Sequence, residues 1–200
     1  NSLSNLKVSN LDTLLLHNPL ALSQCHRDQL CMELLCLREE KILDRLGVSV
    51  YAPSELAECM KYLEFSVVQA PFNILDRRMK GSGWLEKLKK VNIEFHARSP
   101  FLQGLLLMQL GAHPLYFNRW RSFFEKWDTI TEHSLANQIK YCLKSVLFED
   151  YVNRCVVGVA SHNHLVQLLE LLPNLGEMCD LENLASSDID LIEPRRWPVE

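Results

Sequence analysis

Polar side chains directly follow several short apolar runs in the sequence. Their types are suited to contacts with a carbonyl group or an amide. His17 follows three leucines, and an imidazole can donate a hydrogen bond to a carbonyl oxygen from either ring nitrogen. The alternative is an isolated histidine that only caps a strand. Gln69 follows two valines and carries two donors and an acceptor on one amide, although a buried glutamine satisfied by the backbone is equally common.

Other apolar runs also end in polar or small residues. Ser49, Arg98 and Ser99 close two of these runs, and Gly158 to Ser161 follow the last one. Because the carboxyl ends of parallel strands meet on one face of a barrel or at one edge of a sheet, we expect these residues to form one candidate site.

Two further patterns carry weaker functional signals. Arg77 and Arg78 follow Asp76, and such a pair can bind a phosphate, but charges that begin a helix more often form a solvated face. Four aromatic residues with i, i+3, i+4, i+7 spacing predict the core-facing side of a helix. They are Trp120, Phe123, Phe124 and Trp127.

Composition places the chain among ordinary globular proteins. It has 200 residues, of which 48% are hydrophobic and 23% charged, so we expect a single domain over residues 1–200. The formal net charge is -4 and no long basic run occurs, which argues against a nucleic-acid partner. No apolar stretch approaches the roughly 20 residues of a membrane helix. With no signal-peptide pattern at its start, the sequence predicts a cytoplasmic protein that does not bind membranes.

The cysteines predict neither a disulfide framework nor a metal site. There are seven of them, with no Cys-x-x-Cys pair and no zinc-finger spacing to histidine. Four lie within apolar patterns and are expected to be buried free thiols, as is common for cysteine. They are Cys31, Cys36, Cys142 and Cys155.

Short apolar runs alternate with longer segments of helical spacing. The runs predict buried parallel strands at residues 11–16, 48–51, 65–69, 93–97 and 155–159. Helices are predicted at residues 24–44, 54–62, 83–91, 116–147 and 162–172, with Ser54 as an N-cap and Pro53 just outside the helix. This alternation predicts βαβ units and a parallel sheet, hence an α/β fold.

Alternation alone fits both a doubly wound sheet and a (β/α)8 TIM barrel. The sequence contains neither Gly-x-Gly-x-x-Gly nor Gly-x-x-x-x-Gly-Lys-Ser/Thr, the nucleotide-binding signatures of open sheets. The barrel is therefore favoured. Because a complete barrel has eight strands in about 250 residues, the five predicted strands indicate an incomplete barrel.

Taken in order, these strand ends resemble the aldo/keto reductase family over nearly the whole chain. Residues 11–19 resemble the family's strand that ends in its catalytic histidine, and residues 47–51 and 67–78 resemble the next two strands. Residues 97–106 resemble the seventh strand with its loop, and residues 156–161 the eighth strand with the following helix N-terminus. Residues 194–197, together with Arg-Ser-x-Phe-Leu-Gln-Gly at 98–104, resemble one subgroup. The resemblance implies a barrel without its first three βα units.

The resemblance also implies a site. His17 is the partner of the substrate carbonyl, and Ser49 and Gln69 contact the nicotinamide amide of NADPH or NADH. The other implied cofactor contacts lie in the loop after the seventh strand and near the adenosine phosphates, where a helix N-terminus favours negative charge. They are Arg98, Ser99, Pro100, Phe101, Gln103 and Gly104 in the loop, and Gly158 and Ser161 near the phosphates. The implied reaction is hydride transfer to a small-molecule aldehyde or ketone.

Three positions depart from the family pattern. Val50 stands where the family commonly has an asparagine that contacts the amide, and Arg98 stands where an aromatic often stacks on the nicotinamide. A guanidinium can lie on a ring, although it is charged. Ala160 occupies the place of the basic residue that selects the NADP 2′-phosphate in many members. The choice between NADPH and NADH therefore stays open.

In this family the general acid is a tyrosine, assisted by a lysine and an aspartate, and all three precede the region that this chain resembles. We expect a preceding segment or a partner chain to supply them, and we expect this chain alone to be inactive. Loss of a positioned proton donor costs on the order of 10²–10⁴ in rate. The alternative is a non-catalytic interaction or regulatory protein derived from the barrel.

Overall fold

The computed structural model describes residues 2–17, 26–176 and 181–198. The chain forms two compact units. Unit 1 comprises residues 1–70 and 79–96, and unit 2 comprises residues 71–78 and 97–200. The predicted single domain over residues 1–200 stays a prediction.

Five strands are hydrogen-bonded in the order in which they occur in the sequence. They are β1 (Leu11–Leu16), β2 (Leu43–Ser49), β3 (Val67–Pro71), β4 (Glu94–Arg98) and β5 (Arg154–Val156). The pairs β1–β2 and β2–β3 are parallel, with Leu14 opposite Leu46 and Ser49 opposite Gln69. Parallel pairing of strands that alternate with helices confirms the predicted α/β class.

The helices of the first half of the chain are α1 (Ser2–Leu6), α2 (Arg27–Glu39), α3 (Pro53–Cys59), α4 (Arg78–Gly81) and α5 (Trp84–Lys90). The longer helices of unit 2 are α6 (Arg121–Ile130), α7 (Leu135–Leu147) and α8 (His162–Leu171), followed by the short α9 (Ile189–Ile192). Short segments of 3-10 helix are η2 (Leu105–Leu107), η3 (Leu115–Trp120), η4 (Leu172–Asn174), η5 (Glu182–Leu184) and, after α9, η6 (Pro194–Arg196).

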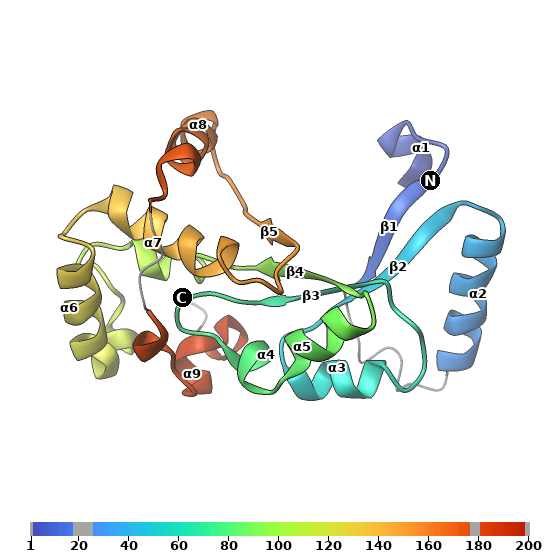
Figure 1. Ribbon diagram of the computed structural model, residues 1–200, viewed down its shortest axis with the longest axis horizontal. Helices are drawn as coiled ribbons and strands as arrows, with labels where there is room; N and C mark the ends of the chain where they lie inside the picture. The colour runs from blue at the N-terminus through green and yellow to red at the C-terminus, as the bar shows by residue number, and fades with distance from the viewer. Residues whose placement is uncertain (1, 18–25, 177–180, 199–200) are drawn as a thin grey trace. The chain divides into compact units, whose positions relative to one another are not determined.

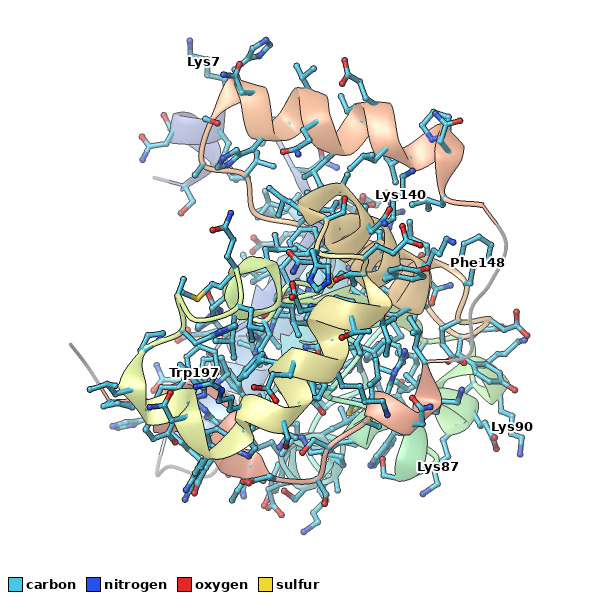
Figure 2. All side chains as sticks on the ribbon, turned by 90° about the vertical axis from the view of Figure 1, so that its left-hand side faces the viewer. Lys7, Lys87, Lys90, Lys140, Phe148 and Trp197 are labelled. Atoms are coloured by element: carbon cyan, nitrogen blue, oxygen red, sulfur yellow. The ribbon has the colours of Figure 1, made fainter. Side chains whose placement is uncertain are left out.

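The core of unit 1 forms between its strands and its helices. Leu46 and Val48 alternate along β2 and are fully buried, and α2 lies alongside this strand in Figure 1. Helix α5 buries Leu85, at 1% exposure, on its inner side. Its basic side chains point outward, as Lys87 and Lys90 do in Figure 2. Burial of each such leucine or valine contributes roughly 1.5–3 kcal/mol, so this face holds the strands in place.

Gly47 lies at a close approach between the three parallel strands of unit 1. A Cβ atom at this position would lie 2.4 Å from Leu15 Cδ2 and 2.7 Å from the carbonyl oxygen of Val67. No real side chain fits such distances, so glycine is required here by packing. It brings β1 and β3 close to β2 two residues before Ser49.

Unit 2 is built around aromatic side chains. Phe124 and Trp127 are each 2% exposed and belong to one core cluster with Leu106 and Ile192. The Trp127 indole N–H donates to the carbonyl oxygen of Leu106 at 2.9 Å, so the buried polar atom of this side chain is satisfied. The predicted core-facing aromatic side of the helix is confirmed at these two positions, while Trp120 and Phe123 pack around the cluster partly buried.

Two long predicted helices have wrong limits. The helix predicted at 24–44 ends at Glu39 in its described part, because Lys41 adopts a left-handed backbone with φ of 57° and β2 begins at Leu43. The start of that prediction lies outside the described residues. The helix predicted at 116–147 is divided into η3, α6 and α7, with Glu132 and His133 at positive φ between the last two. After α2 and between α6 and α7, a local left-handed turn interrupts a continuous apolar pattern.

The predicted N-cap at Ser54 is also wrong. The N-cap is Ala52, and Pro53 is the first residue of α3, where a missing backbone N–H costs nothing. The Glu55 carboxylate accepts from the Tyr51 N–H at 2.6 Å and so satisfies a donor at this helix start. Strand β5 ends at Val156, so residues 157–159 of the predicted strand lie outside it.

The cysteines of the described residues are free thiols. Cys142 is buried, and Cys31 and Cys155 are partly buried, whereas Cys36 is exposed on α2 and contradicts the prediction for that position. Helix α2 has little amphipathic contrast, which explains the error. Among the described residues, no three His, Cys, Asp or Glu side chains cluster so that they could hold a metal ion. None of the described helices is both long and apolar enough to cross a membrane.

Candidate functional site

Ser49 and Gln69 form a hydrogen-bonded pair at the ends of β2 and β3. They are register partners in the parallel ladder, and the Ser49 hydroxyl donates to Gln69 Oε1 at 3.0 Å. The Val50 N–H donates to the Gln69 carbonyl oxygen at 2.9 Å and fixes the backbone beside them. Ser49 is 3% exposed and Gln69 is partly exposed, so the pair presents the glutamine amide rather than the serine.

The side-chain NH₂ group of Gln69 is available to donate hydrogen bonds to a ligand. Its oxygen faces the Ser49 hydroxyl, and within the described part of the chain Nε2 has no hydrogen-bond partner. An amide held at one end and open at the other can pair with a second amide. The alternative of a glutamine satisfied by the backbone does not hold for this side chain.

His17 lies directly after β1 and is exposed. Residues 18–25, which follow it, lie outside the described residues. The backbone of β1 is held in register against β2, with Leu16 opposite Val48. The strand therefore fixes where the His17 backbone lies in unit 1, while its implied contact with a substrate carbonyl stays a prediction.

A network of charged side chains connects β1, β2 and β4 near their N-terminal ends in unit 1. Arg45 on β2 pairs with Asp12 at 2.6 Å and with Glu94 at 2.7 Å, and Glu94 also contacts His96 Nε2 at 3.0 Å. The hydrogen bond with Asp12 is the main cause of the raised pKa of Arg45. These groups are satisfied by one another, so they serve strand pairing rather than ligand binding.

In unit 2, Asn73 organises the turn that follows β3. It is 0% exposed, and its Oδ1 accepts from the N–H groups of Leu75 and Asp76, each at 2.9 Å. Its Nδ2 donates to the carbonyl oxygen of Ser99 at 3.0 Å. One side chain thus ties the turn after β3 to the loop after β4, next to the backbone bond from the Phe72 N–H to the Arg98 carbonyl at 3.1 Å.

The loop after β4 is a compact series of turns with left-handed residues. Positive φ occurs at Ser99 (58°), Leu102 (46°), Gln103 (55°) and Gly104 (85°). Hydrogen bonds from the Leu102 N–H to the Ser99 carbonyl and from the Gly104 N–H to the Phe101 carbonyl, both 3.0 Å, close two of the turns. Alternation of right- and left-handed residues makes concave backbone surfaces that suit anions. Pro100 is buried, whereas Gln103 is exposed and directed to solvent or ligand.

Arg77 and Arg78 have structural partners in unit 2, so the expectation of a solvated face is wrong. Arg77 donates to the Ser145 carbonyl oxygen at 2.9 Å and lies over the Phe72 ring at 4.5 Å. Arg78 pairs with Asp76, which is 1% exposed, at 2.8 Å and with Glu193 at 3.3 Å. Arg78 thus neutralises the buried Asp76 carboxylate, and both cations are engaged by protein groups of unit 2.

The last predicted contacts lie around the start of α8. Ser161 is the N-cap of this helix, and its hydroxyl accepts from the His164 N–H at 3.2 Å. The hydroxyl is therefore engaged, and only the other N–H groups of the first turn remain for an anion. Gly158 is exposed, and a Cβ there would meet nothing within 4 Å, so packing does not require a glycine.

The predicted residues thus fall into two sets. Unit 1 holds His17, Ser49 and Gln69, and the last two are in contact. Unit 2 holds the loop at 98–104 and the residues at 158–161, and Arg98 lies 3.5 Å from the Ser99 hydroxyl. The sequence analysis covered Asn73 only within the range 67–78 and gave it no role. Its signal is an asparagine shortly after a strand, a residue type whose side chain can accept from the backbone N–H two residues on, as in an Asx turn.

Comparison with known proteins identifies the family of this chain and supports its fold. The sequence model of the Aldo/keto reductase family matches residues 1–179. No curated protein matches the chain. An aldo-keto reductase from Bacillus halodurans is structurally similar in two forms. The apo form has a TM-score of 0.69 at 20% identity, covering 98% of this chain and 69% of that one. The holo form has a TM-score of 0.69 at 19% identity, covering 98% and 67%.

A thermostable aldo-keto reductase, solved in complex with the inhibitor epalrestat, has a TM-score of 0.64 at 18% identity, covering 92% of this chain and 63% of that chain. At such identities structural similarity shows the fold alone. It confirms the predicted fold, an α/β chain that matches an incomplete (β/α)8 barrel. This chain spans between 63% and 69% of these proteins.

Proposed function

This chain belongs to the aldo/keto reductase family, and from that premise we propose that it forms the cofactor side of an oxidoreductase that reduces an aldehyde or ketone to an alcohol. The family and the fold suggest oxidoreductase activity. NADPH or NADH, when bound, supplies the hydride. The observation that carries the proposal is the Ser49–Gln69 pair, because it holds one amide with its donors open at the end of a strand.

The donor set of this pair fits a carboxamide. Ser49 holds Gln69 Oε1 on one side, and Gln69 Nε2 is left to donate to a ligand carbonyl. The second lone pair of Oε1 can accept from a ligand NH₂ group. Two amides can therefore pair through complementary hydrogen bonds, which is the recognition that a nicotinamide ring needs. Val50 offers no side-chain amide beside them, so the contact depends on Gln69.

The other residues have separate proposed roles. His17 donates a hydrogen bond to the substrate carbonyl and orients it. The turns at 98–104 and the first N–H groups of α8 hold the cofactor phosphates through backbone dipoles. Asn73 holds the first of these loops in place through the Ser99 carbonyl. The proton donor, a tyrosine supported by a lysine and an aspartate in this family, is provided by a preceding segment or a partner chain.

We also propose a cytoplasmic location. It is supported by the free thiols among the described cysteines, of which Cys59 and Cys142 are buried. Free thiols persist where thioredoxin and glutathione keep them reduced.

Titration of the protein with NADPH and with NADH, followed by nicotinamide fluorescence, tests the assignment. We expect saturable binding that weakens about tenfold in Gln69→Ala, since one or two net hydrogen bonds of roughly 0.5–1.5 kcal/mol each are lost. Gln29→Ala is the matched control, because Gln29 is an exposed glutamine on α2 whose side chain donates to Glu33 at 2.9 Å. It should leave the dissociation constant unchanged.

Equal affinity of Gln69→Ala and the unchanged protein would show that the pair does not bind the cofactor. Absence of binding for both cofactors would favour the alternative of a non-catalytic interaction protein. The ratio of the two dissociation constants would assign cofactor preference, which Ala160 leaves open.

A further inference from the structure

Unit 1 contains an open pocket of about 470 Å³ where α2 ends and β2 begins. Three of its lining residues come from the C-terminal end of α2, and three come from the turn and the strand that follow. They are Leu35, Arg38, Glu39, Lys41, Leu43 and Asp44. Leu43 is 2% exposed and belongs to the core, whereas Leu35 is 44% exposed. The pocket therefore combines an apolar surface with charged side chains of both signs.

The charged groups of this pocket do not neutralise one another. Arg38 and Lys41 supply two cations, and Glu39 and Asp44 supply two carboxylates. Within the described part of the chain, none of these four side chains forms a hydrogen bond or an ion pair. By contrast, Arg45 directly after the pocket is bound by two carboxylates. Unpaired charges around an apolar surface can orient a ligand that carries both charges and an apolar part.

The turn between α2 and β2 fixes the position of one cation. The Lys41 N–H donates to the Arg38 carbonyl oxygen at 3.0 Å, and the Ile42 N–H donates to the Leu37 carbonyl oxygen at 3.1 Å. With the left-handed backbone of Lys41, at φ of 57°, these bonds form a Schellman motif, in which glycine is the usual residue at this position. A lysine is less stable there, because its Cβ crowds the backbone. It nevertheless places a cation in the wall of the pocket.

The pocket lies at the opposite end of β2 from the Ser49–Gln69 pair. Leu43 begins this strand and Ser49 ends it. The strand has seven residues that rise roughly 3.3 Å each, so its two ends lie about 20 Å apart. Catalytic groups of (β/α)8 barrels stand at the C-terminal ends of the strands, whereas this pocket is at an N-terminal end. It is therefore a separate site from the one that the proposed reaction uses.

From these observations we propose that the pocket binds a small zwitterion with an apolar side chain, the chemical class of free amino acids and short peptides. The carboxylate of the ligand meets the two cations, its ammonium group meets the two carboxylates, and its side chain packs on the leucines. Exposed ion pairs are individually weak, so binding depends on the three contacts together, with dissociation constants in the millimolar range.

Titration of the whole chain with L-leucine and with the dipeptide leucyl-leucine, followed by NMR of the backbone amides, tests the proposal. We expect saturable shifts at residues 35–44, and the tighter ligand identifies whether an amino acid or a peptide is bound. N-Acetyl-leucine lacks the ammonium group and leucinamide lacks the carboxylate, so each should bind about fivefold more weakly, the effect of two exposed ion pairs. Equal affinity of all four ligands, or no saturable shift with either zwitterion, would overturn the proposal.

A pair of glycine variants separates binding from folding. Lys41→Gly removes a cation and relieves the left-handed backbone, so leucine affinity should fall about threefold while the urea midpoint stays equal or rises. Asn92→Gly is the matched control. Asn92 follows α5 in the same motif, with φ of 56° and bonds from its N–H to the Lys89 carbonyl at 3.2 Å and from the Ile93 N–H to the Leu88 carbonyl at 3.0 Å. This variant should leave leucine affinity unchanged.

The carboxylate side of the pocket is tested by Asp44→Asn, a change of nearly the same shape at an exposed position. It should weaken the binding of leucine and leave that of N-acetyl-leucine unchanged, because N-acetyl-leucine has no ammonium group to lose a partner. Unchanged leucine affinity in both Lys41→Gly and Asp44→Asn would refute the zwitterion site. All of these measurements are made without a nicotinamide, so their outcome is independent of the proposed reductase activity.

Discussion

Replacement of Asn73 by alanine is the sharpest test of how the candidate site is held. The substitution removes three hydrogen bonds, to the N–H groups of Leu75 and Asp76 and to the carbonyl oxygen of Ser99. Both N–H groups lie in buried surroundings, and each unsatisfied buried donor costs roughly 1–3 kcal/mol. With a small cavity added, we expect a loss of about 3–5 kcal/mol in the free energy of unfolding, a large share of the roughly 5–15 kcal/mol of a typical domain.

Urea unfolding followed by circular dichroism measures this loss. The midpoint should move to lower urea while the slope stays unchanged, since the surface exposed on unfolding is nearly the same. Asn163→Ala is the control, because Asn163 is exposed on α8. A loss below about 1 kcal/mol for Asn73→Ala would refute the reasoning, because it would mean that water or a rearranged turn satisfies these N–H groups.

The remaining predictions concern pH, thiol reactivity and packing. Burial lowers the pKa of His113, whose buried Nε2 has no partner within the described residues, so protonation opposes folding. The free energy of unfolding should therefore fall as pH drops from about 7 to about 5, and His113→Gln should flatten this dependence in urea titrations. Burial raises the pKa of Cys59 to about 11, so peptide mapping after brief alkylation at neutral pH should find Cys36 modified and Cys59 intact. Equal modification would contradict the burial of Cys59. Gly47→Ala should lower the thermal midpoint markedly, because its Cβ would lie 2.4 Å from Leu15 Cδ2, and an unchanged midpoint would show that β1 can move away.

The sequence predicted most strand positions well where an apolar run was short and bounded, but β2 runs over Leu43–Ser49 rather than the predicted 48–51. Strand β1 coincides with the predicted 11–16, and the pairing of Ser49 with Gln69 follows from two such runs ending at one edge. The sequence analysis failed where the φ angle of a single residue ended a helix. Lys41 and Glu132 adopt positive φ, and neither residue type is typical of a left-handed turn, so the breaks after α2 and before α7 could not be predicted from hydrophobic spacing.

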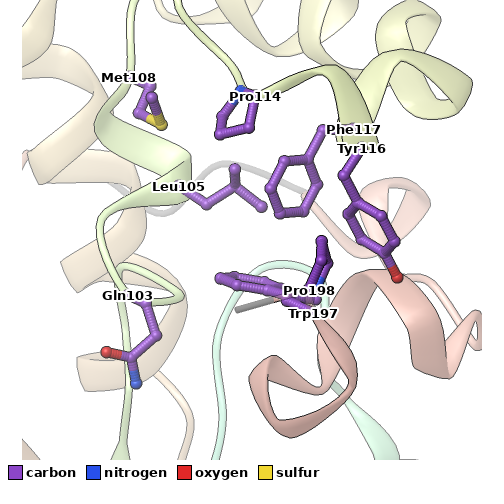
Figure 3. Close-up of a pocket in the computed structure, with 8 residues that line it drawn as sticks. All are labelled: Gln103, Leu105, Met108, Pro114, Tyr116, Phe117, Trp197 and Pro198. Atoms are coloured by element: carbon purple, nitrogen blue, oxygen red, sulfur yellow. The ribbon is translucent and has the colours of Figure 1, made fainter. Parts of the chain in front are cut away.

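The sequence analysis also missed contacts between residues that lie far apart in the chain. Arg78 was expected on a solvated face, but Glu193 meets it across 115 positions of the chain. A pocket in unit 2 brings Gln103 and Trp197 together in the same way (Figure 3). Such pairings depend on the tertiary path of the chain, which no local pattern encodes.

Asp190 joins three segments of unit 2, namely α9, η3 and η6. Its carbonyl oxygen accepts from the Tyr116 hydroxyl at 3.0 Å, and its carboxylate pairs with Arg119 at 3.0 Å and with Arg196 at 2.6 Å. If the carboxylate is lost, Arg119 and Arg196 face each other without their shared anion. One partly exposed side chain near the end of the chain therefore helps to hold η3 in place, although 71 positions separate Asp190 from Arg119.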